Sequence, residues 1–435
     1  MTTRDRIPTA APHELTATLA GMRTRGVDMV ELSTVDNAGI ARSEGIPLDH
    51  LDRATRRGVE TNPWLELVSL GNVRAADQRP GGPGGLRLVP DLTRLRPMSE
   101  QQGWAWAPAD KYTADGTRHS ACQRHFARRQ TTALAETGVH ARIAFAHPWY
   151  LFGHGGDGYF GSLGSQVGME GTAEHARGLI SSLRAQGIEV DSYRPGMAPR
   201  PRLSTSPTDP LTAADDAVLV RHTTRQYAPK YGLAASFSPV ISPEVPGVHA
   251  PLRLSLHNGA ETLHAGDGPH GLSPEAEAFA AGILAELPAL VAIGAGSAAS
   301  FVGAEPAERT ATWGCSEGDD LRVIPGLRGS EDDTAGIELT CFDATANPYL
   351  LVGAVLAAGA AGVRGELRLP DETGRRPQLP TTTADSAEAL ANSELLAEAM
   401  GEELHAAVVA VRRCEAKSAT ERSPEEIINA ARMAW

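Results

Sequence analysis

The chain has few cysteines and few aromatic residues, and it lacks an excess of positive charge. Its four cysteines lie far apart without a Cys-x-x-Cys pair, so we expect neither a zinc ribbon nor a disulfide scaffold, and a reducing cytoplasm fits best. The net charge is -13 at pH 7. This disfavours a nucleic-acid-binding protein, because such proteins present a basic surface. The first 30 residues lack the apolar segment of a signal peptide.

Only one uncharged stretch raises the question of a membrane. It runs from Ala344 to Val363, reads ATANPYLLVGAVLAAGAAGV, and is followed by Arg364. The Asn347-Pro348 pair interrupts it, which leaves an apolar run of about 16 residues where a span needs roughly 20. We therefore predict a buried helix, and a protein that does not contact a membrane.

The length of 435 residues exceeds one ordinary hydrophobic core and suggests two or three domains. Helical spacing over residues 12–26 is followed by strand alternation on both sides of an Asn-Ala-Gly turn, which indicates a small α+β unit. Strands and helices then alternate to the end of the chain. We predict an N-terminal domain over residues 1–118 and a larger domain over residues 119–435. P-loop, GxSxG, HExxH and Rossmann glycine motifs are absent.

Several local sequences occur in a familiar order. The stretch FDATANPYLLVGAVLAAGAAGV closely matches the Asp-x-x-x-Asn-Pro-Tyr-Leu helix of the glutamine synthetase family. PDLTRLRP, DPLTAADDA, YGLAASFSP, LRLSL and ATWG also resemble segments of that family in the same order. Each match is weak alone, but their collinearity extends over essentially the whole chain. The sequence therefore resembles a divergent, type I-like member of the glutamine synthetase family.

This resemblance implies an α+β fold, with a small N-terminal β-grasp domain and a catalytic domain whose curved antiparallel sheet is flanked by helices. It also implies a ring-shaped oligomer, a hexamer or dodecamer, with active sites between subunits. Family members make an acyl phosphate from glutamate and ATP and then an amide from ammonia, while some relatives use other acids or amines. Glutamates and a histidine hold two or three Mg²⁺ or Mn²⁺ ions, which suits the preference of hard ions for carboxylate oxygens.

Most of the family's site positions carry other residue types in this chain. The family has metal-binding glutamates, a metal-binding histidine, substrate arginines and an ammonium-site aspartate there. The departing positions are Ala144, Ala146, Pro195, Pro251, Gly303, Gly318, Thr340 and Gly85. Glu338 alone remains of the metal ligands, and one carboxylate does not hold two divalent ions. We therefore predict no metal site and no bound ATP, Mg²⁺ or Mn²⁺.

Two of the replacements introduce arginine. Arg202 and Arg253 stand at family metal or phosphate positions, and Arg200 lies beside the first of them. One interpretation is a substrate pocket in which guanidinium groups bind a carboxylate or phosphate directly. The other is that these arginines are solvated or paired with an acid, namely Asp191, Glu189 or Glu338.

The remaining candidates are two histidines and an acid. His147 is a possible substrate-binding residue or base, although strand alternation places it opposite the two alanines. His249 is a candidate catalytic base, or a lone ligand if a two-residue shift lets it replace the family histidine; the sequence leaves this open. Glu338 is either a catalytic acid/base or a relic paired with an arginine. Glu305 and Glu308, near the family's flap glutamate, are interpreted as ordinary loop acids.

From these departures we predict a protein that has lost the ligase chemistry. It would be a pseudoenzyme or a structural or regulatory subunit, in a homo-oligomeric ring or in rings mixed with an active paralogue. One alternative is a repurposed, metal-independent enzyme of a specialised biosynthetic pathway acting on an anionic, amino-acid-like substrate. A second alternative is a remnant carboxylate–amine ligase of the glutamate–ammonia or glutamate–amine type. Binding of ATP with Mg²⁺ separates the last alternative from the others.

Overall fold

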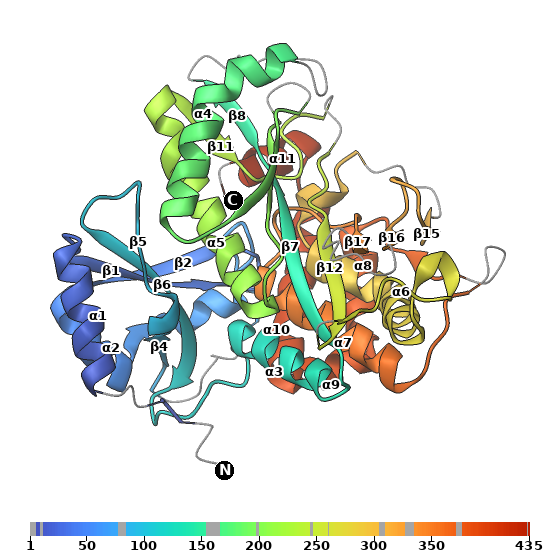
Figure 1. Cartoon of the computed structure of the whole chain (residues 1–435), viewed down its shortest axis with the longest axis horizontal. Helices are drawn as coiled ribbons and strands as arrows, with labels where there is room; N and C mark the ends of the chain where they lie inside the picture. Colours follow the sequence, from blue (N-terminus) through green and yellow to red (C-terminus); the bar gives the residue numbers. More distant parts are fainter. Residues whose placement is uncertain are drawn as a thin grey trace.

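Two β-sheets, each with its own helices, organise the chain (Figure 1). The computed structural model describes residues 6–8, 12–76, 84–153, 166–196, 200–243, 247–259, 261–303, 309–326, 335–370, 376–432 and 434–435. Of the sequence candidates, Glu305 and Glu308 lie outside these described residues. The α+β class is confirmed, with a small N-terminal sheet beside a larger sheet flanked by helices. The division into domains at residue 118 stays a prediction, and the two parts are called domains below in that sense.

The N-terminal sheet has the strand order β2-β1-β6-β4-β3, and β5 pairs with β6. β1 and β6 are parallel, whereas the other pairs are antiparallel. Met22 of α1 and Leu51 of α2 join Val30 and Leu88 in a hydrophobic cluster of their own. The bounds are α1 Pro12–Thr24, β1 Met29–Val35, β2 Ala41–Pro47, α2 Leu51–Arg57, β3 Val59–Thr61, β4 Leu86–Pro90, β5 Arg96–Pro97 and β6 Trp104–Thr113.

The larger sheet has the strand order β15-β16-β17-β12-β7-β10-β9, and β13 pairs with β12. All of its pairs are antiparallel except β15–β16. The bounds are β7 His140–Pro148, β9 Val190–Arg194, β10 Arg202–Thr205, β12 Leu252–Asn258, β13 Glu261–Thr262, β15 Trp313–Gly314, β16 Leu321–Ile324 and β17 Gly336–Leu339. Two further pairs are β8 Tyr150–Gly153 with β11 Leu233–Ser236, and β14 Arg309–Thr310 with β18 Gln378–Leu379.

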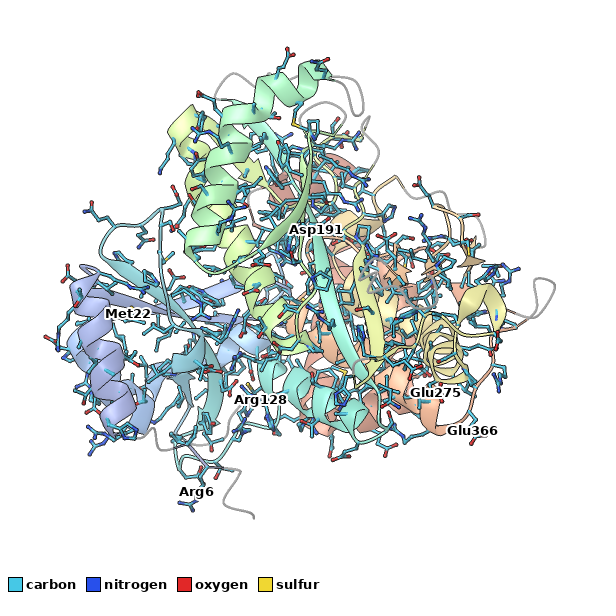
Figure 2. All side chains as sticks on the ribbon, viewed as in Figure 1. Arg6, Met22, Arg128, Asp191, Glu275 and Glu366 are labelled. Carbon is cyan, nitrogen blue, oxygen red and sulfur yellow. The ribbon has the colours of Figure 1, made fainter. Side chains whose placement is uncertain are left out.

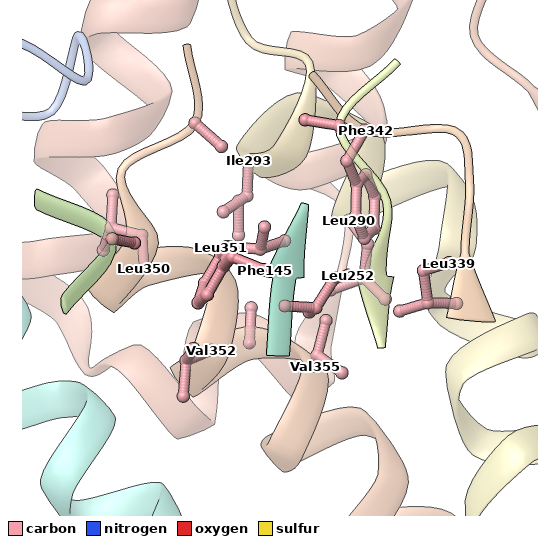
Figure 3. Close-up of a cluster of buried hydrophobic side chains, with 14 of the residues drawn as sticks. Phe145, Leu252, Leu290, Ile293, Leu339, Phe342, Leu350, Leu351, Val352 and Val355 are labelled. Atoms are coloured by element: carbon pink, nitrogen blue, oxygen red, sulfur yellow. The ribbon is translucent and has the colours of Figure 1, made fainter. Parts of the chain in front are cut away.

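The helices of the larger domain cover one face of this sheet and extend around it. Their bounds are α3 Gln123–Ala135, α4 Gln166–Ala185, α5 Pro210–Tyr227, α6 Pro274–Gly294, α7 Pro348–Arg364, α8 Thr383–Ala391, α9 Glu394–Met400, α10 Glu402–Thr420 and α11 Pro424–Arg432. Figure 3 shows Phe145 of β7, Leu252 of β12 and Leu339 of β17 packed with side chains of α6 and α7. Since side chains alternate along a strand, the residues between them point to the opposite face.

The uncharged stretch forms α7, a buried core helix, as predicted. Asn347 caps it by accepting hydrogen bonds from the backbone N–H groups of Tyr349 and Leu350, and Pro348 occupies its first turn. The same Asn347 side chain donates to the carbonyls of Val35 and Asp36, which ties the helix to the N-terminal domain.

α6 is also long and apolar enough to span a membrane, a possibility that the sequence had not suggested. However, 83% of its most apolar window is buried in the protein. It packs lengthwise against α7, and its Glu277 is buried where it binds Arg368. Both apolar helices are therefore core helices of this fold.

Small residues let α6 and α7 approach closely. A Cβ atom added to Gly362 would lie 2.1 Å from the carbonyl oxygen of Ala278, and one added to Gly282 would lie 2.3 Å from that of Ala358. Backbone atoms cannot move aside as a flexible side chain can. The glycines are therefore required by the spacing of the two helix axes.

We expect Gly362→Ala to lower the free energy of unfolding by about 2–3 kcal/mol, because the added methyl group must push the two helices apart. Gly21→Ala is the matched control, since Gly21 lies in α1 with nothing within 4 Å of its added Cβ. There the same substitution should stabilise by about 0.5–1 kcal/mol through helix propensity. Urea denaturation followed by circular dichroism measures both. Equal effects in the two variants would contradict the close-packing argument.

Most charged side chains lie at the periphery, as Figure 2 shows for Arg6, Glu275 and Glu366. Arg124 of α3 is an exception, because its side chain is only 2% exposed. It donates to both carboxylate oxygens of Asp215 (2.8 and 2.9 Å), to Asp110 (3.2 Å) and to Asp91 (2.8 Å). Because Asp91 and Asp110 belong to the N-terminal domain and Asp215 to α5, this buried network joins the two domains.

Candidate functional site

The face of the large sheet that points away from α6 and α7 is polar. On β12, Leu252 and Leu254 are fully buried against the helices, while Arg253 between them points to the other face. Arg253 lies opposite Ala144 on β7 and opposite Glu338 on β17. The register therefore brings Arg253 and Glu338 side by side, two residues that are 85 positions apart (338 minus 253) in the chain.

Two more arginines join this face. Arg322 on β16 lies opposite Glu338 and donates a hydrogen bond from Nη1 to Oε2 over 3.2 Å. Arg202 on β10 lies opposite Pro148 and Arg194. Burial and the neighbouring Arg194 lower the pKa of Arg202, and the carboxylates of Glu338 and Glu317 partly oppose this. We call Arg202, Arg253 and Arg322, with Glu338, the arginine face.

The arginine face has hydrogen-bonding capacity to spare. Arg202 Nε, Arg253 Nη2 and Arg322 Nε are buried and have no hydrogen-bond partner in the described part of the chain. A buried donor without a partner costs roughly 1–3 kcal/mol, so such groups usually await a ligand or water. Planar guanidinium groups match the oxygens of carboxylates and phosphates. The geometry therefore suits an anionic group of a substrate.

The acids considered as partners of Arg202 and Arg253 form no ion pair with these two arginines among the described residues. Glu189 and Asp191 are both exposed, and within the described residues neither forms an ion pair with Arg202 or Arg253. Figure 2 labels Asp191 on β9. Glu338 does pair with an arginine, but with Arg322, which the sequence analysis had not named. The available signal was the alternation in LRVI, where one arginine interrupts an apolar strand just as Glu338 interrupts GIEL.

His147 is not gathered with the arginine face. It points to the helix side of β7, its side chain is 2% exposed, and its ring stacks near Phe145 with the centroids 6.0 Å apart. Burial, with the nearby Arg221 charge, lowers the pKa of His147 to about 3. Arg200 lies over the ring of Tyr150, with its guanidinium carbon 5.9 Å from the ring centroid. Roles of His147 and Arg200 in binding substrate stay predictions.

His249 lines a cavity of about 660 Å³ beyond one end of the β12–β17 pair. The strand pairing reaches this cavity, because the backbone N–H of Ala250 donates to the carbonyl of Phe342 over 2.7 Å. Burial lowers the pKa of His249, although the carboxylate of Asp343 acts in the opposite direction. The imidazole is therefore neutral near pH 7 and able to accept a proton.

The walls of this cavity are mostly apolar. Its nonpolar lining comes from Pro239, Val248, Val291, Ala295, Ala299, Phe301 and Val302. Asp343 and Arg309 also line it, and the buried Asp343 accepts hydrogen bonds from the backbone N–H and the hydroxyl of Thr345. An elongated substrate with an apolar body and a polar end fits such a lining.

The positions that depart from the family pattern are spread over this region and beyond it. Ala144 and Ala146 lie on the arginine-face side of β7, and Gly303 lines the His249 cavity. The hydroxyl of Thr340 donates to the carbonyl of Asp319 over 2.7 Å. The other positions are Gly85 beside β4, Pro195 after β9, Pro251 before β12, and Gly318 in an exposed turn.

We tested whether the described side chains fit a divalent metal ion. Among them there is no group of three or more His, Cys, Asp or Glu side chains placed to hold one. The described part of this region thus does not by itself form such a site. Further carboxylates fall outside the described residues, among them Asp157, Glu244, Glu305, Glu308, Glu331, Asp332 and Asp333.

Comparisons with known proteins agree with the fold. The family model for the glutamine synthetase catalytic domain matches residues 120–429. The chain is 35% identical over 449 aligned residues to gamma-glutamylpolyamine synthetase GlnA3 of Streptomyces coelicolor, covering 96% of each chain. It is 29% identical to the glutamine synthetase of Mycolicibacterium smegmatis, covering 66% of this chain and 70% of the relative. A crystal structure described as a novel glutamine synthase homolog superimposes with a TM-score of 0.85 at 27% identity, covering 93% and 97%.

These matches overturn three predictions. The prediction of a pseudoenzyme or regulatory subunit is wrong, because the chain aligns along nearly its full length with a protein named as a synthetase. The alternative prediction, a metal-independent enzyme of a specialised pathway, is wrong for the same reason. The prediction that ATP, Mg²⁺ and Mn²⁺ are not bound is wrong for the same reason, since the matching family consists of ligases that use them. Altered motif positions are therefore not evidence that the chemistry has been lost.

Three observations support the family assignment. They are the collinear sequence motifs, the two-sheet fold, and the matches to a family model and to relatives over most of the chain. The chain belongs to the glutamine synthetase family.

Proposed function

We propose that this protein is an ATP-dependent ligase that joins the γ-carboxylate of glutamate to an amine larger than ammonia. The observation that carries the proposal is the 35% identity, over 96% of both chains, to a gamma-glutamylpolyamine synthetase. By family resemblance, ATP activates the carboxylate as an acyl phosphate, and the amine then displaces the phosphate. We further propose a ring-shaped oligomer in the cytoplasm, as is usual in this family.

In this proposal the arginine face binds the anionic oxygens of the reactants. Each of Arg202, Arg253 and Arg322 has a buried N–H group without a hydrogen-bond partner among the described residues, which a phosphate or carboxylate would satisfy. Negative charge builds up on these oxygens as the acyl phosphate forms and breaks down, so fixed cations lower the barrier. Glu338 would then act as a positioning residue, since its carboxylate orients the guanidinium of Arg322.

The amine would occupy the His249 cavity. The volume of about 660 Å³ exceeds the need of ammonia, and the apolar walls suit the methylene chain of an alkyl amine. An amine attacks only after losing a proton from its ammonium form. His249, which is buried with a lowered pKa, is neutral near pH 7 and would accept that proton.

The test uses the purified full-length protein with ATP, Mg²⁺ and glutamate, and compares ammonium, ethylamine, putrescine and spermidine as nucleophiles. We expect ADP release that depends on both glutamate and amine, and a product with the mass of glutamate plus amine minus water. Spermidine or putrescine should give a kcat/KM at least tenfold above that for ammonium. Glutamine as the preferred product would instead support ordinary glutamine synthesis. ADP release without any amide, or no ADP release at all, would contradict both ligase functions.

A further inference from the structure

A second cavity, of about 320 Å³, lies where the N-terminal sheet meets the larger domain. Its walls come from strands β1, β2 and β6, from helix α5, and from Ala434 and Trp435. Its described lining contains none of the residues of the arginine face and not His249. Nothing in the proposed ligase reaction uses it.

Arg221 of α5 contributes to this cavity a positive charge that has no ion-pair partner among the described residues. Its Nη2 donates to the carbonyl of Ala346 over 2.9 Å, but its buried Nε has no hydrogen-bond partner among the described residues. Within that same part of the chain, no carboxylate forms an ion pair with it. Burial lowers the pKa of Arg221 to about 10, with Asp343 opposing the shift, so the guanidinium is charged at neutral pH.

Trp435 adds a second unused donor. Its side chain is 4% exposed, it lines the cavity, and its indole N–H has no hydrogen-bond partner in the described structure. The indole nitrogen lies next to Gly39, another lining residue, because a Cβ atom added there would be 3.3 Å away. A buried N–H without a partner is costly, so its presence at a cavity wall indicates that something there accepts its hydrogen bond.

The described cavity wall contains one carboxylate, Glu31, against the two arginines Arg221 and Arg225. Glu31 accepts a hydrogen bond from Ser43 (2.5 Å) and lies 3.4 Å from the imidazole of His222. Burial alone would raise the pKa of Glu31, but the neighbouring His222 and the hydrogen bond from Ser43 hold it below its ordinary value. Arg225, whose Nη1 donates to the carbonyl of Ala434, is a further cation in the wall. The cavity is therefore net positive.

We propose that this cavity binds a small organic carboxylate with an apolar body, at a site separate from the ligase site. The carboxylate oxygens accept hydrogen bonds from Arg221 and from the Trp435 indole. Charge-assisted hydrogen bonds of this kind are the strong ones. The apolar body packs against Val35, Trp106 and Val218, which line the same space. The volume lies at the small end of the usual range for ligand pockets, which suits a molecule of about ten non-hydrogen atoms.

Binding should also stabilise the joint between the domains. Arg221 already contacts the carbonyl of Ala346, immediately before the cap of α7, while Val35 and Trp106 belong to the N-terminal sheet. A ligand that contacts both sides adds a bridge that exists only in the folded protein. The apparent melting temperature therefore rises with ligand concentration.

The experiment uses the full chain, with benzoate as the probe and benzamide as its uncharged counterpart. Calorimetric titration should show one benzoate per chain, and thermal unfolding should show a shift that grows with benzoate concentration, while benzamide does neither. Arg221→Gln, which removes the guanidinium proposed to bind the carboxylate, should weaken benzoate binding about tenfold or more, in a variant shown by circular dichroism to be folded. Ala41→Phe, which fills the cavity from an exposed strand residue, should abolish it.

Two controls separate this site from the ligase site. Arg23→Gln makes the same charge change at a surface pair with Asp49 and should leave benzoate binding unchanged. Arg253→Gln alters the arginine face and should also leave it unchanged, whatever happens to catalysis. The proposal is overturned if benzoate does not bind, if benzamide binds equally well, if Ala41→Phe still binds with correct folding by circular dichroism, or if only Arg253→Gln removes binding.

Discussion

Replacing Arg253 with glutamine is expected to lower kcat/KM for γ-glutamyl amide formation by about 10²–10³-fold. Arg253 sits in the middle of the arginine face, between Ala144 and Glu338 on its two neighbouring strands. Its buried Nη2 has no partner among the described residues, so it is available to the anionic oxygens of the reactants. Glutamine keeps a polar side chain with an N–H donor, but it is shorter and removes the charge and the planar fork. The rate is measured from product mass and ADP release under subsaturating substrate.

Two further variants sharpen this prediction. Arg253→Lys keeps the charge but loses the paired donors, so it should recover only part of the lost activity. Arg413→Gln is the matched control, because Arg413 is an exposed arginine of α10 that makes paired hydrogen bonds to Glu388. The control should keep its activity within about twofold, since an exposed ion pair contributes little.

The arginine face has no part in catalysis if Arg253→Gln keeps more than a third of the activity while its melting temperature is unchanged. Arg253 points away from α6 and α7, so the core remains packed in the variant. Loss of activity is therefore attributable to the site, provided that circular dichroism shows the native fold.

Replacing Arg124 with methionine is expected to destabilise the protein by about 3–5 kcal/mol, the usual effect of removing one member of a buried ionic network. The variant leaves Asp91, Asp110 and Asp215 close together without the cation that links them. The hydroxyl of Tyr349, which donates to Asp215 over 2.9 Å, remains and compensates only in part. Urea denaturation at pH 7 measures the loss, with Arg413→Met as an exposed control that should cost no more than about 1 kcal/mol.

The destabilisation caused by Arg124→Met should depend on pH. Burial raises the pKa of Asp110, but the charges of Arg124 and Arg128 hold it at about 2. A carboxyl with a depressed pKa stabilises the fold above its unfolded pKa, and this stabilisation is lost as the pH falls. In Arg124→Met the pKa of Asp110 rises, so the difference between the two proteins should shrink between about pH 4 and pH 2.

A double variant tests whether the network rather than packing is responsible. Arg124→Met combined with Asp215→Leu removes both members of the closest pair, so fewer buried charges are left unpaired. It should be less destabilised than the sum of the two single variants. Additive effects, or a loss below about 1 kcal/mol for Arg124→Met, would show that the network does not contribute as described.

Part of the candidate site follows from residue order. Strand alternation predicted that His147 points away from Ala144 and Ala146, and the structure places it on the helix side. The same alternation isolates Glu338 as the one acid of its strand. Alternation does not reveal which strands are neighbours. The arginine that pairs with Glu338 is therefore Arg322, and not Arg202 or Arg253, which the motif comparison had singled out.

The functional prediction failed for a related reason. Comparing motifs position by position shows which site residues of the family are replaced in this chain. It does not show which other side chains the fold brings to the same face, since these come from strands far apart in the sequence. Arg202, Arg253 and Arg322 belong to three different strands and meet only when the sheet forms.

The fold class, the family and the buried nature of α7 follow from the chain alone, because strand alternation, the order of short motifs and the length of an apolar run can be read along it. The composition of the arginine face, the Arg124 network between the domains and the cavity beside Arg221 and Trp435 depend on the folded structure. Each of these depends on contacts between segments that are distant in sequence. Such contacts are selected by the packing of the whole core, in which strand register and the close approach of α6 and α7 set where every side chain lies.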